Sequence, residues 1–289
     1  MNKKICVITG ANSGIGKQAA IQIANKGYHV IIGCRNKERG EAALNEIKKL
    51  STSNNIELMI VDMSLKSSIS EFSKNIRDKY DKIDVLIHNA ANFDIAQKSA
   101  IITSEGYEAI WITNHIGPVL LTNHLLDLLR KSDDPRIVTI ASKGLITMPT
   151  LKVNLDDPEF KTRKFSVGKA YYQAKLAQVM YTYWLAKELN TEGISVNAIR
   201  VPAVQVDISR HPEISSFLKW VYKQKSKRSI TPSRMAETYT YFATNTSIKG
   251  VSGKYFNENN QEVPSSKYSN NWDNINAVMN LTREYIKNK

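Results

Sequence analysis

Short, almost continuously apolar runs alternate with segments of helical periodicity along the whole chain. Runs of this kind are typical of parallel strands that are buried on both faces of a sheet. We predict strands over 5–9, 29–34, 56–62, 83–89, 136–142, 194–201 and 254–257. We predict helices over 15–25, 37–50, 67–80, 105–129, 167–189 and 272–287. The alternation predicts an α/β fold with a doubly wound, mostly parallel sheet.

The length of the chain, 289 residues, suits one large core, and we predict a single domain over residues 1–289. Within it, the irregular segment 204–230 contains apolar residues at helical spacing and is predicted to be a lid over the substrate site. The chain has only two cysteines and no apolar run long enough to span a membrane. Its opening residues, MNKKICVITG, do not contain the long apolar stretch that is typical of a secretory signal. We therefore expect a cytoplasmic protein without a membrane span.

The chain carries 40 Lys and Arg against 27 Asp and Glu, which gives a net charge of +13. Most of these basic residues are scattered over polar helix faces, and no zinc-finger spacing or RNA-binding aromatic motif accompanies them. The charge therefore favours a solvated basic surface and a phosphate-bearing ligand, and we expect no nucleic-acid partner. The five histidines show no metal-ligand spacing, so no metal site is predicted.

The first predicted strand leads into a glycine-rich turn that opens the first predicted helix. Its glycines follow the pattern G-x-x-x-G-x-G. Glycines in this place let the backbone approach a pyrophosphate, which then lies at the positive end of the helix. The pattern predicts a Rossmann fold that binds a dinucleotide. The residues expected to contact it here are Gly10, Asn12, Ser13, Gly14, Ile15 and Gly16.

The end of the second predicted strand indicates which dinucleotide is preferred. An NAD-binding protein usually has an acidic residue there for the ribose hydroxyls, whereas this chain has Arg35. A guanidinium suits a 2′-phosphate, so we expect NADP(H) to be preferred over NAD(H). After the third strand, Asp62 and Met63 are expected to contact the adenine end of the cofactor.

Tyr171 and Lys175 are four residues apart in a predicted helix, so their side chains lie on the same face. A nearby ammonium stabilises a phenolate and lowers the pKa of the tyrosine towards that of a working general acid/base. Ser142 ends the fifth predicted strand, at the carboxyl edge of the sheet where ligands of such folds bind. The three side chains together predict a site for proton transfer.

These motifs together resemble the short-chain dehydrogenase/reductase family, over nearly the whole chain. The resemblance includes the TGANSGIG turn, the HNAA stretch at 88–91, and Asn114 in the fourth predicted helix. Longer stretches, such as NHIGPVLLTNHLLDLL, are similar to the retinol-dehydrogenase-like subgroup.

The resemblance implies a role for each matching residue. Tyr171 would be the proton donor or acceptor, and Lys175 would hold the nicotinamide ribose and lower the tyrosine pKa. Ser142 would orient the substrate oxygen, and Asn114 would support a water chain to Lys175. The remaining residues expected to line the cofactor are Asn89, Ala90 and Pro202.

The predicted function is that of an NADP(H)-dependent oxidoreductase. It would move a hydride between the nicotinamide and the carbonyl or alcohol carbon of a small hydrophobic substrate, with reduction as the expected direction. The resemblance also implies a homodimer through the helices that carry Asn114 and Tyr171. The sequence leaves the identity of the substrate open.

Some positions depart from the family pattern. Ala91 and Ala203 replace glycines, His88 replaces an asparagine, and no threonine follows Ala203. Alanine adopts a positive φ less readily than glycine. These departures favour an alternative, a cofactor-binding sensor that has lost turnover, whereas the retained proton-transfer residues favour an enzyme.

Overall fold

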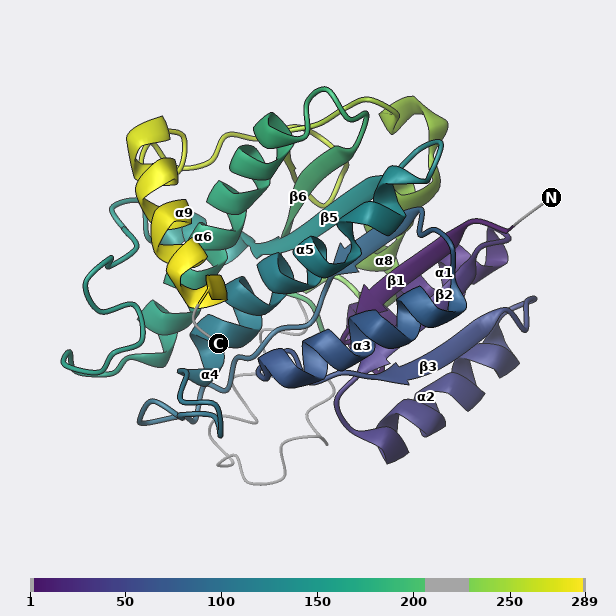
Figure 1. Ribbon diagram of the computed structural model, residues 1–289, viewed down its shortest axis with the longest axis horizontal. Coiled ribbons are helices and arrows are strands. Elements are labelled where there is room, and N and C mark those ends of the chain that lie inside the picture. Colours follow the sequence, from purple (N-terminus) through teal and green to yellow (C-terminus); the bar gives the residue numbers. More distant parts are fainter. Residues whose placement is uncertain (1–2, 206–228, 288–289) are drawn as a thin grey trace.

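The computed structural model describes residues 3–205 and 229–287, and its centre is one sheet of seven parallel strands (Figure 1). The strands are β1 (Ile5–Thr9), β2 (His29–Cys34), β3 (Ile56–Ile60), β4 (Val85–His88), β5 (Arg136–Ser142), β6 (Ser195–Val201) and β7 (Lys254–Phe256). Their order is β3-β2-β1-β4-β5-β6-β7. The chain thus proceeds outwards from β1 in both directions, which confirms the predicted doubly wound α/β fold.

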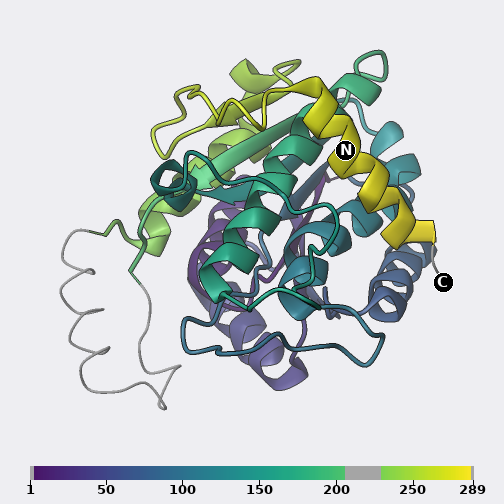
Figure 2. The ribbon, with the colours of Figure 1, turned by 90° about the vertical axis from the view of Figure 1, so that its left-hand side faces the viewer.

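Helices cover both faces of the sheet. One face carries α1 (Gly14–Asn25), α2 (Lys37–Leu50) and α8 (Pro232–Thr244). The other carries α3 (Lys66–Lys79), α5 (Gly117–Arg130) and α6 (Val167–Glu188), and α9 (Trp272–Lys287) packs against α6 (Figure 2). The short elements are α4 (Ala109–Trp111), η1 (Ile112–Ile116), η2 (Lys143–Thr147) and η4 (Thr246–Ile248).

The alternation of side chains along each strand explains why the strands are apolar throughout. In β1, Val7 enters the core under α3, α5 and α6, whereas Ile8 enters the core under α1 and α8. Successive side chains of a strand point to opposite faces, so a strand covered on both faces needs apolar residues at every position.

The prediction of one helix over 105–129 is wrong in two respects: the helix starts later, and a π-helical turn interrupts it. The chain turns at Gly106, whose φ is +84°, and the helix begins only at Ala109. The carboxylate of Glu108 caps it by accepting a hydrogen bond of 2.8 Å from the Trp111 amide. Residues Ile112–Ile116 then form a π-helical turn before α5. A π-helical turn contains one residue more than an α-helical turn, and apolar periodicity does not reveal this difference. The sequence analysis therefore did not predict the π-helical turn.

Helix α8 was absent from the predicted elements, although its start carries a local signal. Thr231 accepts a hydrogen bond of 3.1 Å from the Arg234 amide through its side-chain oxygen, and Pro232 occupies the first turn. A capping threonine followed by proline is a typical helix start. The helix packs against α1 and completes that layer. No helix in the described ranges combines the length and apolar character that crossing a membrane requires.

Two histidines lie in the core without contact with solvent. His88 ends β4 and its Nε2 lies 2.8 Å from the hydroxyl of Thr122. His115 in η1 lies 2.7 Å from the hydroxyl of Thr282, and so connects η1 to α9. Burial lowers the pKa of each imidazole to about 3, and for His88 the charge of Lys175 acts in the same direction. Both histidines are therefore neutral in the folded protein near pH 7.

We expect acid to destabilise the fold through these histidines. Below about pH 6.5 the unfolded chain takes up a proton on each, whereas the folded chain does so only near pH 3. The free energy of unfolding therefore falls as the pH drops below 6.5. Urea unfolding at pH 7 and pH 5 measures this loss. The loss should be smaller by about 2 kcal/mol in a His115→Gln variant, which keeps a polar partner for Thr282. Equal losses in both proteins would contradict the assignment.

Candidate active site

The turn between β1 and α1 packs directly against the segment that follows β4. Gly10 and Gly14 have φ angles of +67° and +55°, which favour glycine. A Cβ on Gly10 would lie 2.7 Å from the Cα of Ala90, and one on Gly16 would lie 2.4 Å from Nδ2 of Asn89. The same Nδ2 donates a hydrogen bond of 3.1 Å to the Gly10 carbonyl. Backbone conformation and close packing together therefore require glycine here.

The first turn of α1 is open to an anion. Among the described residues, the side chain of Ser13 makes no capping hydrogen bond and no acidic side chain lies in the first turn. The amide groups at a helix start have no partner within the helix, and they carry partial positive charge. A phosphate can therefore bind at this end of α1.

A hollow of about 530 Å³ lies beside this turn, at the carboxyl edge of the sheet. Ten of the predicted cofactor residues line it: Gly10, Asn12, Ser13, Ile15, Gly16, Arg35, Asp62, Met63, Asn89 and Ala90. The predicted residues outside this lining are Gly14, Tyr171, Lys175 and Pro202. The structure therefore brings residues from four separate segments of the chain together around one cavity.

Arg35 and Arg39 line this hollow from the segment that follows β2. The Arg35 side chain is 75% exposed, and its Nε lies 3.9 Å from a carboxylate oxygen of Asp62. Arg39, which the sequence analysis missed, lines the same hollow. Asn36 caps α2 by accepting a hydrogen bond of 2.8 Å from the Arg39 amide, and this cap sets Arg39 on the first turn. In the sequence, Asn36 is a residue type that commonly caps a helix, and it indicates that Arg39, three residues later, lies in the first turn.

Ser142 and Tyr171 meet at the end of β5. The hydroxyl of Ser142 accepts a hydrogen bond of 3.2 Å from the Gly144 amide, which orients it. Burial raises the pKa of Tyr171, and the neighbouring Tyr172 adds to this, whereas a hydrogen bond with Ser142 lowers it. The balance favours the neutral phenol, which can donate a proton; the lowering of this pKa by Lys175 that the sequence predicts is not among its causes.

Lys175 is fully buried beneath the tyrosine, and its Nζ lies 5.9 Å from the centre of the Tyr171 ring. The Nζ donates to the Ile140 carbonyl at 2.7 Å and to Oε1 of Gln178 at 3.0 Å. Burial lowers the pKa of Lys175 to about 7. Gln178, which the sequence analysis missed, therefore holds the lysine head from one turn further along α6.

Asn114 lies in the π-helical turn and connects it to the loop after β4. Its Oδ1 accepts a hydrogen bond of 2.8 Å from the Asn92 amide, and its Nδ2 donates one of 2.9 Å to the Asn92 carbonyl. In this structure Asn114 therefore fixes the loop that continues from Asn89 and Ala90. Its part in a water chain to Lys175 stays a prediction.

Phe93 follows in the same loop and contacts the catalytic tyrosine candidate. The ring centres of Phe93 and Tyr171 are 4.5 Å apart, and Phe93 is 41% exposed. A half-exposed aromatic ring therefore flanks the phenol that the sequence predicts for proton transfer. No local sequence pattern indicated this contact, because it joins a loop to a distant helix.

The predicted lid, 204–230, lies mostly outside the described residues, which end at 205 and resume at 229. Its two ends lie side by side. The Gln205 amide donates to the Ile230 carbonyl at 3.0 Å, and the Ile230 amide donates to the Ala203 carbonyl at 3.2 Å. Ala203, which replaces a glycine of the family pattern, does not have a positive φ and is therefore not strained. In the described ranges the non-glycine residues with positive φ are Phe160 and Asn260.

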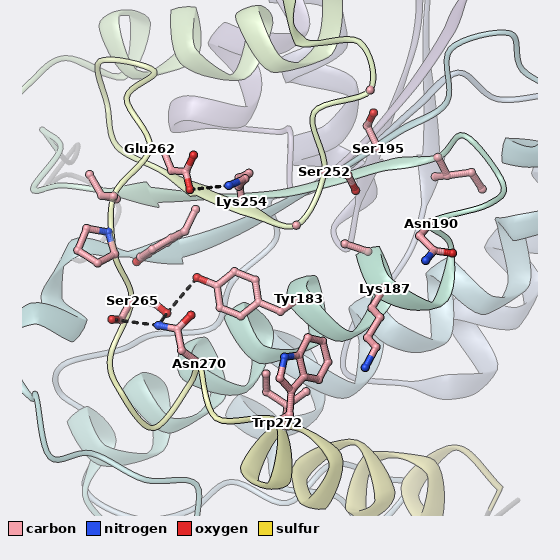
Figure 3. Close-up of a pocket in the computed structure, with 18 of the residues that line it drawn as sticks. Tyr183, Lys187, Asn190, Ser195, Ser252, Lys254, Glu262, Ser265, Asn270 and Trp272 are labelled. Carbon is pink, nitrogen blue, oxygen red and sulfur yellow. Dashed lines mark hydrogen bonds and ion pairs between the residues drawn. The ribbon is translucent and has the colours of Figure 1, made fainter.

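A second, polar hollow of about 790 Å³ lies at the opposite edge of the sheet (Figure 3). Ser195 and Lys254 begin β6 and β7 there, and the ammonium of Lys187 lies 4.2 Å from the centre of the Trp272 ring. Ligands of open parallel sheets bind at the carboxyl ends of the strands, so this hollow is not the expected active site. Across the described ranges, no group of three or more His, Cys, Asp or Glu side chains could hold a metal ion.

Solved structures with this fold are similar over most of the chain. An uncharacterised protein from Mycobacterium paratuberculosis is 25% identical, with a TM-score of 0.73, and the match covers 98% of this chain and 93% of that one. A protein from Escherichia coli CFT073, described as a short chain dehydrogenase and complexed with NADPH, is 22% identical with a TM-score of 0.66. That match covers 89% of this chain and 97% of the other.

Sequence comparison assigns the family. The family model described as short chain dehydrogenase matches residues 4–152. Human retinol dehydrogenase 13 is 32% identical over 271 residues, which cover 91% of this chain and 78% of that protein. Human retinol dehydrogenase 12 is 32% identical, with coverage of 93% and 82%. The chain is therefore an oxidoreductase that belongs to the short-chain dehydrogenase/reductase family.

Proposed function

We propose that this protein is an NADP(H)-dependent enzyme that interconverts a carbonyl and an alcohol on an apolar substrate, with Tyr171 as general acid/base. One observation carries the proposal. The phenol of Tyr171 pairs with Ser142 above the anchored ammonium of Lys175, at the same edge as the glycine-lined hollow. A protein that only bound a cofactor would not need this set of proton-transfer groups.

The glycine turn supports a bound dinucleotide. A Cβ at Gly10 or Gly16 would collide with neighbouring atoms of the chain, so both positions need glycine. A turn without these side chains also leaves its backbone open to a diphosphate. The open first turn of α1 would hold the phosphates. When bound, the nicotinamide supplies or accepts the hydride.

The charge at the adenine side supports NADP(H) over NAD(H). Arg35 and Arg39 both line the hollow there, and among its described lining residues the one carboxylate is that of Asp62. Guanidinium groups match the geometry of a phosphate and can bind it with two hydrogen bonds each. Both arginines would contact the 2′-phosphate.

The protonation of Tyr171 supports reduction of a carbonyl. Burial favours its neutral phenol, which donates the proton to the carbonyl oxygen while Ser142 orients that oxygen. The resulting phenolate is stabilised by the ammonium of Lys175, which Gln178 and the Ile140 carbonyl hold in place. Each group therefore has one task in moving a single proton.

The surroundings of the phenol support an apolar substrate. The half-exposed ring of Phe93 contacts Tyr171 and offers an aromatic face beside the reacting atoms. Several relatives are named retinol dehydrogenases, and retinol is an alcohol with a long apolar body. We infer that the substrate is an apolar aldehyde, ketone or alcohol of this general kind.

Replacing Tyr171 by phenylalanine tests the acid/base assignment. We expect turnover of retinal with NADPH to fall by about 10² to 10⁴, since this is what general acid/base catalysis contributes. NADPH affinity and thermal stability should stay close to those of the wild type. The rate of NADPH oxidation measures turnover, and a panel of apolar ketones replaces retinal if retinal is not reduced.

Tyr172→Phe is the matched control, because it removes the same hydroxyl from the adjacent residue, which packs over Gly144. We expect it to keep most of the activity. A Tyr171→Phe variant with the wild-type rate would overturn the assignment. Tight NADPH binding with no turnover of any carbonyl by the wild type would favour the sensor alternative.

Arg35→Asp tests the cofactor preference. The substitution replaces attraction to the 2′-phosphate by repulsion, so NADPH should bind at least about tenfold more weakly while NADH changes little. Titration of each cofactor by calorimetry measures this. Lys37→Asp makes the same charge change at a side chain outside the hollow and serves as the control. Equal losses of NADPH and NADH would mean that Arg35 does not read the phosphate.

A further inference from the structure

A third hollow, of about 480 Å³, lies on the α6 side of the sheet. Leu145 and Met148 form one wall, from the segment after β5, and Leu176 and Val179 of α6 form another. None of the side chains proposed for proton transfer is among its described lining residues. Its size and apolar lining are those of a pocket for a small molecule.

This hollow is distinct from the polar one at the opposite edge. Tyr255, Pro264 and Ser265 line both cavities and so form the partition between them. A hydrogen bond of 2.9 Å from the hydroxyl of Tyr183 to that of Ser265 fixes the partition on its polar side (Figure 3). The apolar hollow therefore has walls of its own.

Besides the exposed Lys267, the charged residue among the described lining residues of this hollow is Arg200, which is partly buried. Its Nε is out of contact with solvent and has no hydrogen-bond partner, and within the described ranges its guanidinium forms no ion pair. Glu258 lies near enough to interact with its charge; one oxygen of that carboxylate is bonded to Lys143 at 2.7 Å, and the other is buried without a hydrogen-bond partner. A buried N–H without a hydrogen-bond partner costs free energy, and here that group is the Nε–H of Arg200.

The cost is removed when an anion binds the guanidinium. A carboxylate matches its two parallel N–H groups, and the apolar walls suit a hydrocarbon body. Lys267 lines the same hollow from the exposed side and adds a second positive charge at the entrance. The apolar walls and the positive charge of the hollow therefore match an apolar molecule that carries a carboxylate.

We propose that this hollow is a second binding site, separate from the proposed active site, for an apolar molecule with one carboxylate, and that Arg200 binds the carboxylate. A medium-chain fatty acid has this chemistry. The proposal does not depend on the identity of the substrate or the cofactor, because none of its contacts uses the proton-transfer residues.

Titration calorimetry with decanoate, and with decanol as its neutral equivalent, tests the proposal. The wild type should bind one decanoate more tightly than decanol. In an Arg200→Met variant, which keeps an apolar stem, decanoate should bind at least about tenfold more weakly and decanol about equally well. Arg200→Lys should recover part of the loss, since it restores the charge without the paired N–H groups.

Two controls separate this site from the other hollows. Lys187→Met removes a cation from the polar hollow, and Phe93→Ala removes an apolar face from the proposed active site. Both should bind decanoate like the wild type. Equal binding of decanoate and decanol by the wild type, or a loss in either control instead of Arg200→Met, would overturn the proposal. If Arg200→Met does not fold, the wild-type preference and the Arg200→Lys variant still decide the question.

Discussion

The close contact between the glycine turn after β1 and the segment after β4 sets the geometry of the whole carboxyl edge. The Asn89 side chain bonds the turn, and any side chain larger than hydrogen at Gly10 or Gly16 would push the two segments apart. Asn114 holds the continuation of the same segment from the π-helical turn. The glycine turn, the segment after β4 and the π-helical turn are therefore joined beside the glycine-lined hollow, an arrangement that suits the proposed site, where two reactants must be aligned.

Two cations near this edge illustrate how burial and hydrogen bonding combine. Lys175 is fully buried, but the Ile140 carbonyl and Gln178 accept hydrogen bonds from its ammonium and offset part of the desolvation. Arg200 lies on β6, and its buried Nε has no hydrogen-bond partner. The protein therefore provides acceptors for the lysine head, whereas the Nε of Arg200 has none. This contrast is the reason why a different role is proposed for each of the two residues.

Most of the sheet and its helices could be predicted because their patterns are local. Strand and helix periodicity lies within each segment, so the predicted boundaries, apart from the helix over 105–129, fall within two residues of those observed. The π-helical turn was missed because Ile112–Ile116 keeps the apolar character of a regular helix. Helix α8 was missed although Thr231 and Pro232 mark its start. Arg39 had a local signal too, in the cap formed by Asn36.

The sequence by itself determined the parallel sheet, the glycine turn and the shared helix face of Tyr171 and Lys175, because each follows from residues close together in the chain. Only the tertiary structure decided the acceptors that hold Lys175, the ring of Phe93 against Tyr171 and the buried, unpartnered Nε of Arg200. These features depend on contacts between distant segments and on how far each side chain is removed from water. Burial, which sets the pKa of Tyr171 and Lys175, exists only once the layers have packed together.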